Sequence, residues 1–138
     1  MNEQHNLPPV KEGVFTTGQK PQLLGGYCPR CGHYHFPFQD YCSKCLGEME
    51  HREIGCHGRI ESVTSVRTKP PLGLPRPYTV AWIDLEETSL RVFSLIDPET
   101  AEEARIGSAV FLKILPLGVN LANEPCLRPC FSISEKQE

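Results

Sequence analysis

The chain has 138 residues, with 14 Lys or Arg against 17 Asp or Glu, so its formal net charge is −3. This length favours one domain or two very small ones, and the slight acidic excess disfavours binding of nucleic acid through a basic surface. The 13 prolines, about twice the usual share, disfavour a helical bundle. We expect a cytoplasmic protein, because the sequence shows neither an apolar signal region nor a stretch of the ~18 apolar residues that span a bilayer.

Residues 1–20 are polar and contain Pro8, Pro9 and Gly13. This composition predicts an extended or loosely ordered N-terminal arm that is free to dock on a partner.

Four of the seven cysteines form the pattern C-x2-C-x10-C-x2-C within residues 21–57, namely Cys28, Cys31, Cys42 and Cys45. Each C-x2-C pair directs two sulfurs toward one ion, and two facing pairs complete a tetrahedral shell of four thiolates. We therefore predict one structural Zn²⁺ in a rubredoxin-like ribbon. A closed shell has no position for substrate, and a segment this short depends on the ion for its folding energy.

This pattern has other interpretations. Iron is the alternative metal, but the ten-residue gap is short for a rubredoxin-type iron site, and Leu46 replaces the glycine expected after the second pair. A thioredoxin-like redox pair lacks the surrounding βαβ pattern. His33 and His35 flank the first pair and are alternatives to a sulfur ligand, but with four cysteines available we expect surface or packing roles for them.

Three cysteines stand apart from the pattern: Cys56, Cys126 and Cys130. Cys56 and His57 could be a nucleophile and its base, but neighbouring side chains in an extended segment point to opposite faces. A second metal site made from the three cysteines is a further alternative. We expect all three to be ordinary thiols.

From residue 58 onward the composition favours strands. A proline-rich loop over 69–77 interrupts the pattern, and Asp97, Pro98 and Gly107 delimit one short helix. The expected strands are 59–68, 78–85, 90–96, 108–115 and 126–133. Five strands with one helix match a small OB-type barrel over residues 58–134, with Trp82 in its core. The predicted fold is mainly β, an N-terminal arm and a four-Cys zinc ribbon followed by this barrel.

The order of these segments resembles one family, the acyl-CoA-associated zinc-ribbon and OB-fold proteins, long known as a domain of unknown function. The resemblance covers roughly residues 24–132 and is carried by LGGYCPRCG (24–32), FP (36–37), CSKC (42–45), GRIESV (58–63), PYTVAWID (77–84), SLI (94–96) and IGSAV (106–110). It implies a small non-catalytic subunit that forms a hetero-oligomer with a thiolase-like catalytic subunit. It also implies a role in holding the CoA thioester during thiolytic or acyl-transfer chemistry.

The residues themselves agree with an accessory role, because the sequence shows no nucleophilic side chain with a base positioned to activate it. Arg67, Lys69 and Arg76 flank the proline-rich loop, and the phosphates of CoA favour such cations; Tyr78 could stack on adenine. We name these four residues as candidate ligand or partner contacts. The alternatives are a nucleic-acid-binding zinc-ribbon and OB protein, which the charge disfavours, and a small independent enzyme that uses Cys56.

Overall fold

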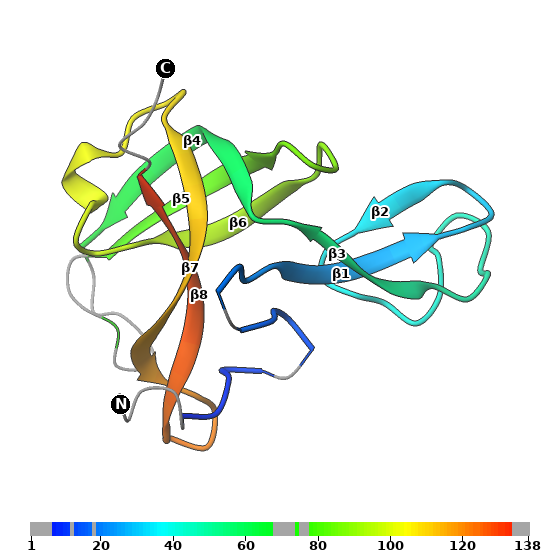
Figure 1. Cartoon of the computed structure of the whole chain (residues 1–138), viewed down its shortest axis with the longest axis horizontal. Helices are drawn as coiled ribbons and strands as arrows, with labels where there is room; N and C mark the ends of the chain where they lie inside the picture. The colour runs from blue at the N-terminus through cyan, green and yellow to red at the C-terminus, as the bar shows by residue number, and fades with distance from the viewer. Residues whose placement is uncertain (1–6, 12, 18, 68–73, 75–77, 134–138) are drawn as a thin grey trace.

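The computed structural model describes residues 7–11, 13–17, 19–67, 74 and 78–133. Within these residues the chain forms a three-stranded sheet and a closed five-stranded barrel. The smaller sheet projects from one side of the barrel, and the strand that leaves it leads directly into the barrel (Figure 1). The expectation of a mainly β chain with an N-terminal four-Cys region and a five-stranded barrel is confirmed.

The smaller sheet, called here the ribbon sheet, consists of β1 (Leu23–Cys28), β2 (His33–His35) and β3 (Glu50–Gly55) in the antiparallel order β2-β1-β3. The sequence of β3, EHREIG, is rich in charge, and four of its side chains are exposed. Its place in the sheet is therefore set by pairing with β1 and by the burial of Ile54 rather than by its own composition.

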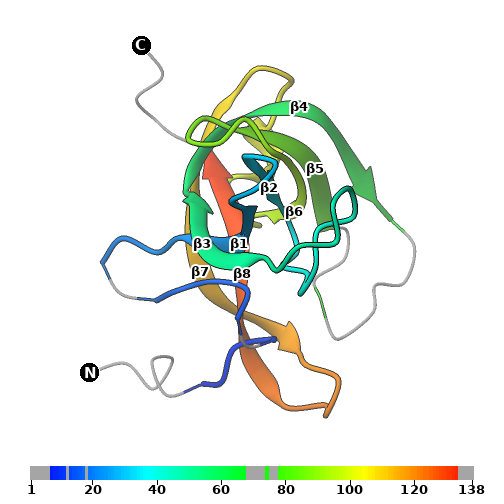
Figure 2. The same cartoon turned by 90° about the vertical axis from the view of Figure 1, so that its right-hand side faces the viewer.

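The barrel has the strand order β4-β5-β6-β8-β7 and closes between β7 and β4. Its strands are β4 (His57–Val66), β5 (Tyr78–Leu85), β6 (Arg91–Ile96), β7 (Ala109–Val119) and β8 (Pro125–Ile133). The pair β6–β8 is parallel and the others are antiparallel. Viewed toward the ribbon sheet, the barrel strands curve around a common axis behind it (Figure 2).

One apolar core joins the barrel to the ribbon sheet. Ile60, Ile83 and Phe131 are at most 2% exposed inside the barrel. Leu23 and Ile54, from β1 and β3, belong to the same buried cluster. The ribbon sheet is consequently anchored on the barrel through apolar contacts, while a separate small cluster surrounds its cysteines.

The segment expected to be a helix is shorter than predicted. Instead of a helix between Asp97 and Gly107, the chain forms a single 3-10 turn, η2 (Ala101–Glu103). Asp97 is 1% exposed and accepts hydrogen bonds from Ser132 Oγ and from the backbone N–H of Glu99, so its carboxylate anchors the connection to β8. Among the described residues no helix is both long and apolar enough to cross a membrane.

The prediction that Trp82 lies in the barrel core is wrong. The side chain is 44% exposed and packs against Phe93 of β6, with ring centroids 5.1 Å apart. Successive side chains of a strand point to opposite faces. Because Ala81 and Ile83 are buried, Trp82 must lie on the outer face of β5.

The N-terminal arm docks on the barrel of its own chain. The backbone N–H of Val10 donates to the carbonyl of Leu127 in β8, and the N–H of Leu127 donates to the carbonyl of Pro8, both at 2.7 Å. Phe15 is 8% exposed and joins the common core. The described part of the arm is therefore ordered by contacts within the chain.

Candidate metal centre

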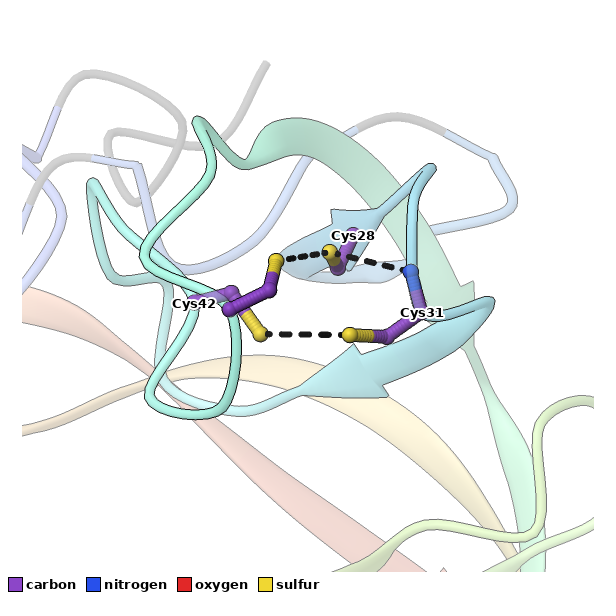
Figure 3. A group of neighbouring side chains, drawn as sticks. Cys28, Cys31 and Cys42 are labelled. Atoms are coloured by element: carbon purple, nitrogen blue, oxygen red, sulfur yellow. Dashed lines mark hydrogen bonds between the residues drawn. The ribbon is translucent and has the colours of Figure 1, made fainter.

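Two turns bring four cysteines together at the outer end of the ribbon sheet. Cys28 ends β1 and Cys31 lies in the turn that leads to β2, whereas Cys42 and Cys45 lie in the connection between β2 and β3. Figure 3 shows that the sulfurs of Cys28, Cys31 and Cys42 point toward a common centre.

The spacing of the sulfurs fits a tetrahedral zinc site. All four Sγ atoms lie within 4.8 Å of one another, with 3.6 Å between Cys28 and Cys45 and 3.9 Å between Cys31 and Cys42. Four sulfurs bound tetrahedrally at ~2.3 Å from one zinc ion lie about 3.8 Å apart. The donor set and its dimensions thus match a structural zinc ion, as the sequence predicts.

Backbone amides surround these sulfurs. N–H groups of Cys31, Lys44 and Gly47 donate to the sulfurs of Cys28, Cys42 and Cys45 respectively, at 3.3–3.4 Å. Such donors stabilise thiolates. The backbone N–H groups of Cys45 and Lys44 lower the pKa of Cys42 to about 5. Hydrogen bonding with Cys45, and then burial, raises the pKa of Cys31 to about 12.

Two histidines approach the same centre. His33 Nε2 lies 3.6 Å from Cys42 Sγ and 2.9 Å from His35 Nε2. Because four sulfurs already supply a complete tetrahedral shell, we assign His33 as a hydrogen-bond partner of Cys42. The sequence hinted at this proximity, since His33 directly follows the turn of the first cysteine pair.

Cys56 and His57 do meet, contrary to the sequence-based expectation. Their Sγ and Nδ1 atoms lie 3.4 Å apart because Cys56 occupies a bend between β3 and β4 rather than an extended segment. Glu87, which the sequence did not single out, completes a cluster with them. Burial and then the negative charge of Glu87 raise the pKa of the Cys56 thiol, the opposite of what activates a nucleophile.

Cys126 and Cys130 are buried thiols. Burial and then the charge of Asp97 raise the pKa of Cys130 to about 12. Within the described part of the chain neither belongs to a group of three close metal-binding side chains, so the alternative of a site shared by Cys56, Cys126 and Cys130 is not supported.

Arg67 and Tyr78, two of the four candidate contact residues, line one hollow of about 410 Å³ beside the last residues of β4 and the first residues of β5. Lys69 and Arg76 lie outside the described residues. The remaining lining is mixed in polarity: Ser65, Thr79, Leu95, Ile96, Pro98, Ala101, Glu102 and Leu117.

Comparison with known proteins places this geometry in context. Residues 18–50 match the family described as "ChsH2, rubredoxin-like zinc ribbon domain". A "DUF35 domain-containing scaffold protein" from Methanocaldococcus jannaschii is 34% identical over an alignment of 98 residues, and the match covers 67% of this chain and 69% of that protein. The "Benzoylsuccinyl-CoA thiolase subunit BbsA" from Thauera aromatica is 32% identical over 81 residues, 58% of this chain and 55% of that subunit.

Two solved structures share the fold. The "Ltp2-ChsH2(DUF35) aldolase" gives a TM-score of 0.63 at 21% identity and covers 81% of this chain and 84% of its own. A DUF35 protein of unknown function from Sulfolobus solfataricus gives 0.50 at 20% identity, with 82% and 76% covered. Together, the zinc-ribbon match and the four-Cys cluster establish a structural zinc ion.

Proposed function

Because the chain belongs to the DUF35 family, we propose that it is a non-catalytic, zinc-binding subunit that assembles with a thiolase-like enzyme and helps to position an acyl-CoA substrate. The observation that carries this proposal is the 34% identity to a scaffold protein over two thirds of the chain. A relative that is a thiolase subunit and a structural neighbour that is an aldolase complex support an enzyme as the partner.

The zinc ion has a structural task in this proposal. We assign Cys28, Cys31, Cys42 and Cys45 as its ligands, and no coordination position then stays open for substrate. We also propose that residues 21–57 form the zinc unit and residues 58–134 the barrel unit. The ion would hold the outer end of the ribbon sheet rigid, so that it can serve as part of an interface.

The thiol chemistry supports a non-catalytic role. Acyl transfer requires a reactive thiolate or hydroxyl with a base and a site for the oxyanion. Cys56 is 6% exposed, and its surroundings favour the protonated thiol. The partner enzyme would accordingly supply the nucleophile.

The hollow lined by Arg67 and Tyr78 supports contact with CoA. Its volume, about 410 Å³, lies within the range of ~300–1,000 Å³ that is usual for small-molecule sites. A guanidinium can pair with the phosphates of CoA, and an aromatic ring can pack on adenine. Glu102 lines the same hollow, and its carboxylate disfavours a phosphate close to it.

Purification of the chain from its native host tests the assembly. We expect it to elute together with a thiolase-like protein in a defined ratio. Elution as a free monomer would overturn the proposal. Retention on single-stranded nucleic acid with a steep salt dependence would instead favour the alternative of a nucleic-acid-binding protein.

Substitution within the purified complex tests the CoA contact. Arg67→Ala should raise the KM for the acyl-CoA substrate by about tenfold, the loss of one charge-assisted contact of ~1.5 kcal/mol, with little change in kcat. Arg59→Ala, near the start of β4 and outside the residues that line the hollow, is the matched control. An unchanged KM in Arg67→Ala would remove the CoA contact from the proposal while leaving the assembly untouched.

A further inference from the structure

A second cluster of potential metal ligands lies where the ribbon sheet joins the barrel. Cys56 connects β3 to β4, His57 begins β4, and Glu87 lies in the turn between β5 and β6. We propose that Cys56 Sγ, His57 Nδ1 and a carboxylate oxygen of Glu87 bind a second divalent transition-metal ion, of which Zn²⁺ is the preferred species. This site is independent of the four-Cys centre and of the proposed acyl-CoA function.

The three donor atoms have the spacing of one face of a coordination tetrahedron. The distances are 3.4 Å from Cys56 Sγ to His57 Nδ1, 3.7 Å from Cys56 Sγ to Glu87 Oε2 and 3.2 Å from His57 Nδ1 to Glu87 Oε2. Tetrahedral zinc with Zn–S of ~2.3 Å and Zn–N and Zn–O of ~2.1 Å requires about 3.6, 3.6 and 3.4 Å. The observed triangle agrees with each edge to about 0.2 Å.

The surrounding backbone holds Glu87 at this place. Its carboxylate accepts hydrogen bonds from the backbone N–H groups of Cys56 at 3.2 Å and of His57 at 3.4 Å. A β-carbon at Gly55 would lie only 2.5 Å from Glu87 Oε1, so glycine is needed for this approach. Burial is the largest single influence and raises the pKa of Glu87. The hydrogen bonds from the two backbone N–H groups and from the His57 side chain together outweigh it, so the pKa of Glu87 lies below its usual value. The carboxylate is therefore both oriented and charged, as a metal ligand must be.

The thiol also has an oriented neighbour. Gln22 Nε2 donates to Cys56 Sγ at 3.4 Å, a contact of the type that orients and stabilises a metal-bound thiolate. In the absence of an ion the thiol itself can donate to Glu87. The same atoms can consequently serve a metal-free and a metal-bound state without a change of fold.

The fourth coordination position can face a hollow of about 280 Å³. Cys56 and His57 line this hollow together with Lys20, Phe111 and Lys113, among others. A thiolate and a carboxylate together neutralise a dication, so the occupied site carries no net charge beside the two lysines. Three protein ligands with a fourth position toward an open space are typical of an exchangeable zinc site rather than a closed structural one. Water or a small anion would be the fourth ligand.

Cobalt binding tests this proposal, because tetrahedral Co²⁺ with a thiolate ligand gives intense visible and near-ultraviolet absorption. The full chain, with zinc bound in the four-Cys centre, is titrated with Co²⁺ while its zinc content is followed. We expect saturation at about one equivalent of Co²⁺ with the zinc retained. Absence of these bands, or bands that grow only as zinc is lost, would overturn the proposal.

Variants then identify the ligands. Cys56→Ala should abolish the thiolate-to-cobalt band, and Glu87→Gln and His57→Gln should each weaken Co²⁺ binding by at least about tenfold. Glu86→Gln, at the exposed neighbouring glutamate, and Cys126→Ala, at a buried thiol outside the cluster, should bind Co²⁺ as the unmodified chain does. The side chains of His57 and Glu87 are 51% and 37% exposed, so their variants retain the core even if Cys56→Ala proves unstable. Equal Co²⁺ affinity in Glu87→Gln and Glu86→Gln would contradict the assignment.

Discussion

Leu46 adopts in the second cysteine pair the backbone conformation that Gly32 adopts in the first. The φ angles are +61° and +75°, and each backbone N–H donates to the carbonyl of the first cysteine of its pair, Cys42 at 2.8 Å and Cys28 at 2.7 Å. The two turns therefore share this backbone geometry, although only one carries glycine. Leu46 therefore bears left-handed strain, and its side chain is 76% exposed.

Replacing this leucine by glycine should stabilise the zinc-bound protein. Left-handed strain at a non-glycine residue costs about 1 kcal/mol or more, and the greater entropy of an unfolded glycine offsets part of this gain. We expect Leu46→Gly to raise the free energy of unfolding by about 0.5 kcal/mol in urea titrations. Leu121→Gly is the control, since Leu121 is 95% exposed and has no positive φ. A loss of stability in Leu46→Gly equal to that in the control would contradict this explanation.

Loss of a proposed zinc ligand should unfold the outer end of the ribbon sheet. Cys28 and Cys42 are fully buried in a cluster that contains few other apolar side chains, so the ion must supply the folding energy there. We expect Cys28→Ser and Cys42→Ser to lose the zinc of the four-Cys centre and the hydrogen-exchange protection of β1 and β2. Cys126→Ala should retain both. Zinc-free protein with protected β1 and β2 amides would show that the ion is dispensable.

Two neighbouring residues of β5 should respond differently to truncation. Trp82 lies on the outer face beside Phe93, so Trp82→Ala should lower the free energy of unfolding by only about 1 kcal/mol. Ile83 is fully buried, and Ile83→Ala should cost about 2–5 kcal/mol. Urea denaturation followed by circular dichroism compares the two variants. Similar losses would mean that Trp82 is buried in solution.

The ion pair of Asp84 with Arg91 should shift the titration of the carboxyl group. Hydrogen bonds from Arg91 Nε at 2.7 Å and from its terminal nitrogen at 3.2 Å hold the pKa of Asp84 below its usual value of 3.8. Arg91→Met should raise this pKa in an NMR titration, whereas Arg52→Met, on β3 of the ribbon sheet, should leave it unchanged. An unshifted Asp84 signal in Arg91→Met would contradict the pairing.

The sign of the accompanying pH effect follows from the lowered pKa. The Asp84 carboxylate is favoured in the folded state. The stabilisation that its pairing with Arg91 gives the folded state is therefore complete above about 3.9, the pKa of an aspartate in the unfolded chain. It disappears as the pH falls through the lower pKa that Asp84 has in the folded state. Because the Asp84 side chain is 44% exposed, the effect on stability is small. The difference in Tm between the unmodified chain and Arg91→Met should therefore shrink as the solution is acidified.

Local patterns predicted several elements well. The strand Tyr78–Leu85 has the bounds expected from its β-branched and aromatic residues, because this composition and the prolines that precede it stand within a few residues of one another in the sequence. Strand β3 was missed because its charged residues pair with β1, which is distant in sequence. The helix expected after Asp97 is only a 3-10 turn, because the buried contact of Asp97 with Ser132 of β8 anchors this connection.

By itself, the sequence determined the four-Cys cluster and the barrel that follows it, because each C-x2-C turn and each strand pattern is specified by residues close together in the chain. Tertiary structure alone decided that Glu87 meets Cys56, 31 residues away, and that Arg67 and Tyr78 share one hollow. Such contacts between residues distant in sequence depend on how the strands pair and on where the barrel closes. Pairing is a property of the whole sheet, since each register must satisfy backbone hydrogen bonds and the burial of one face together.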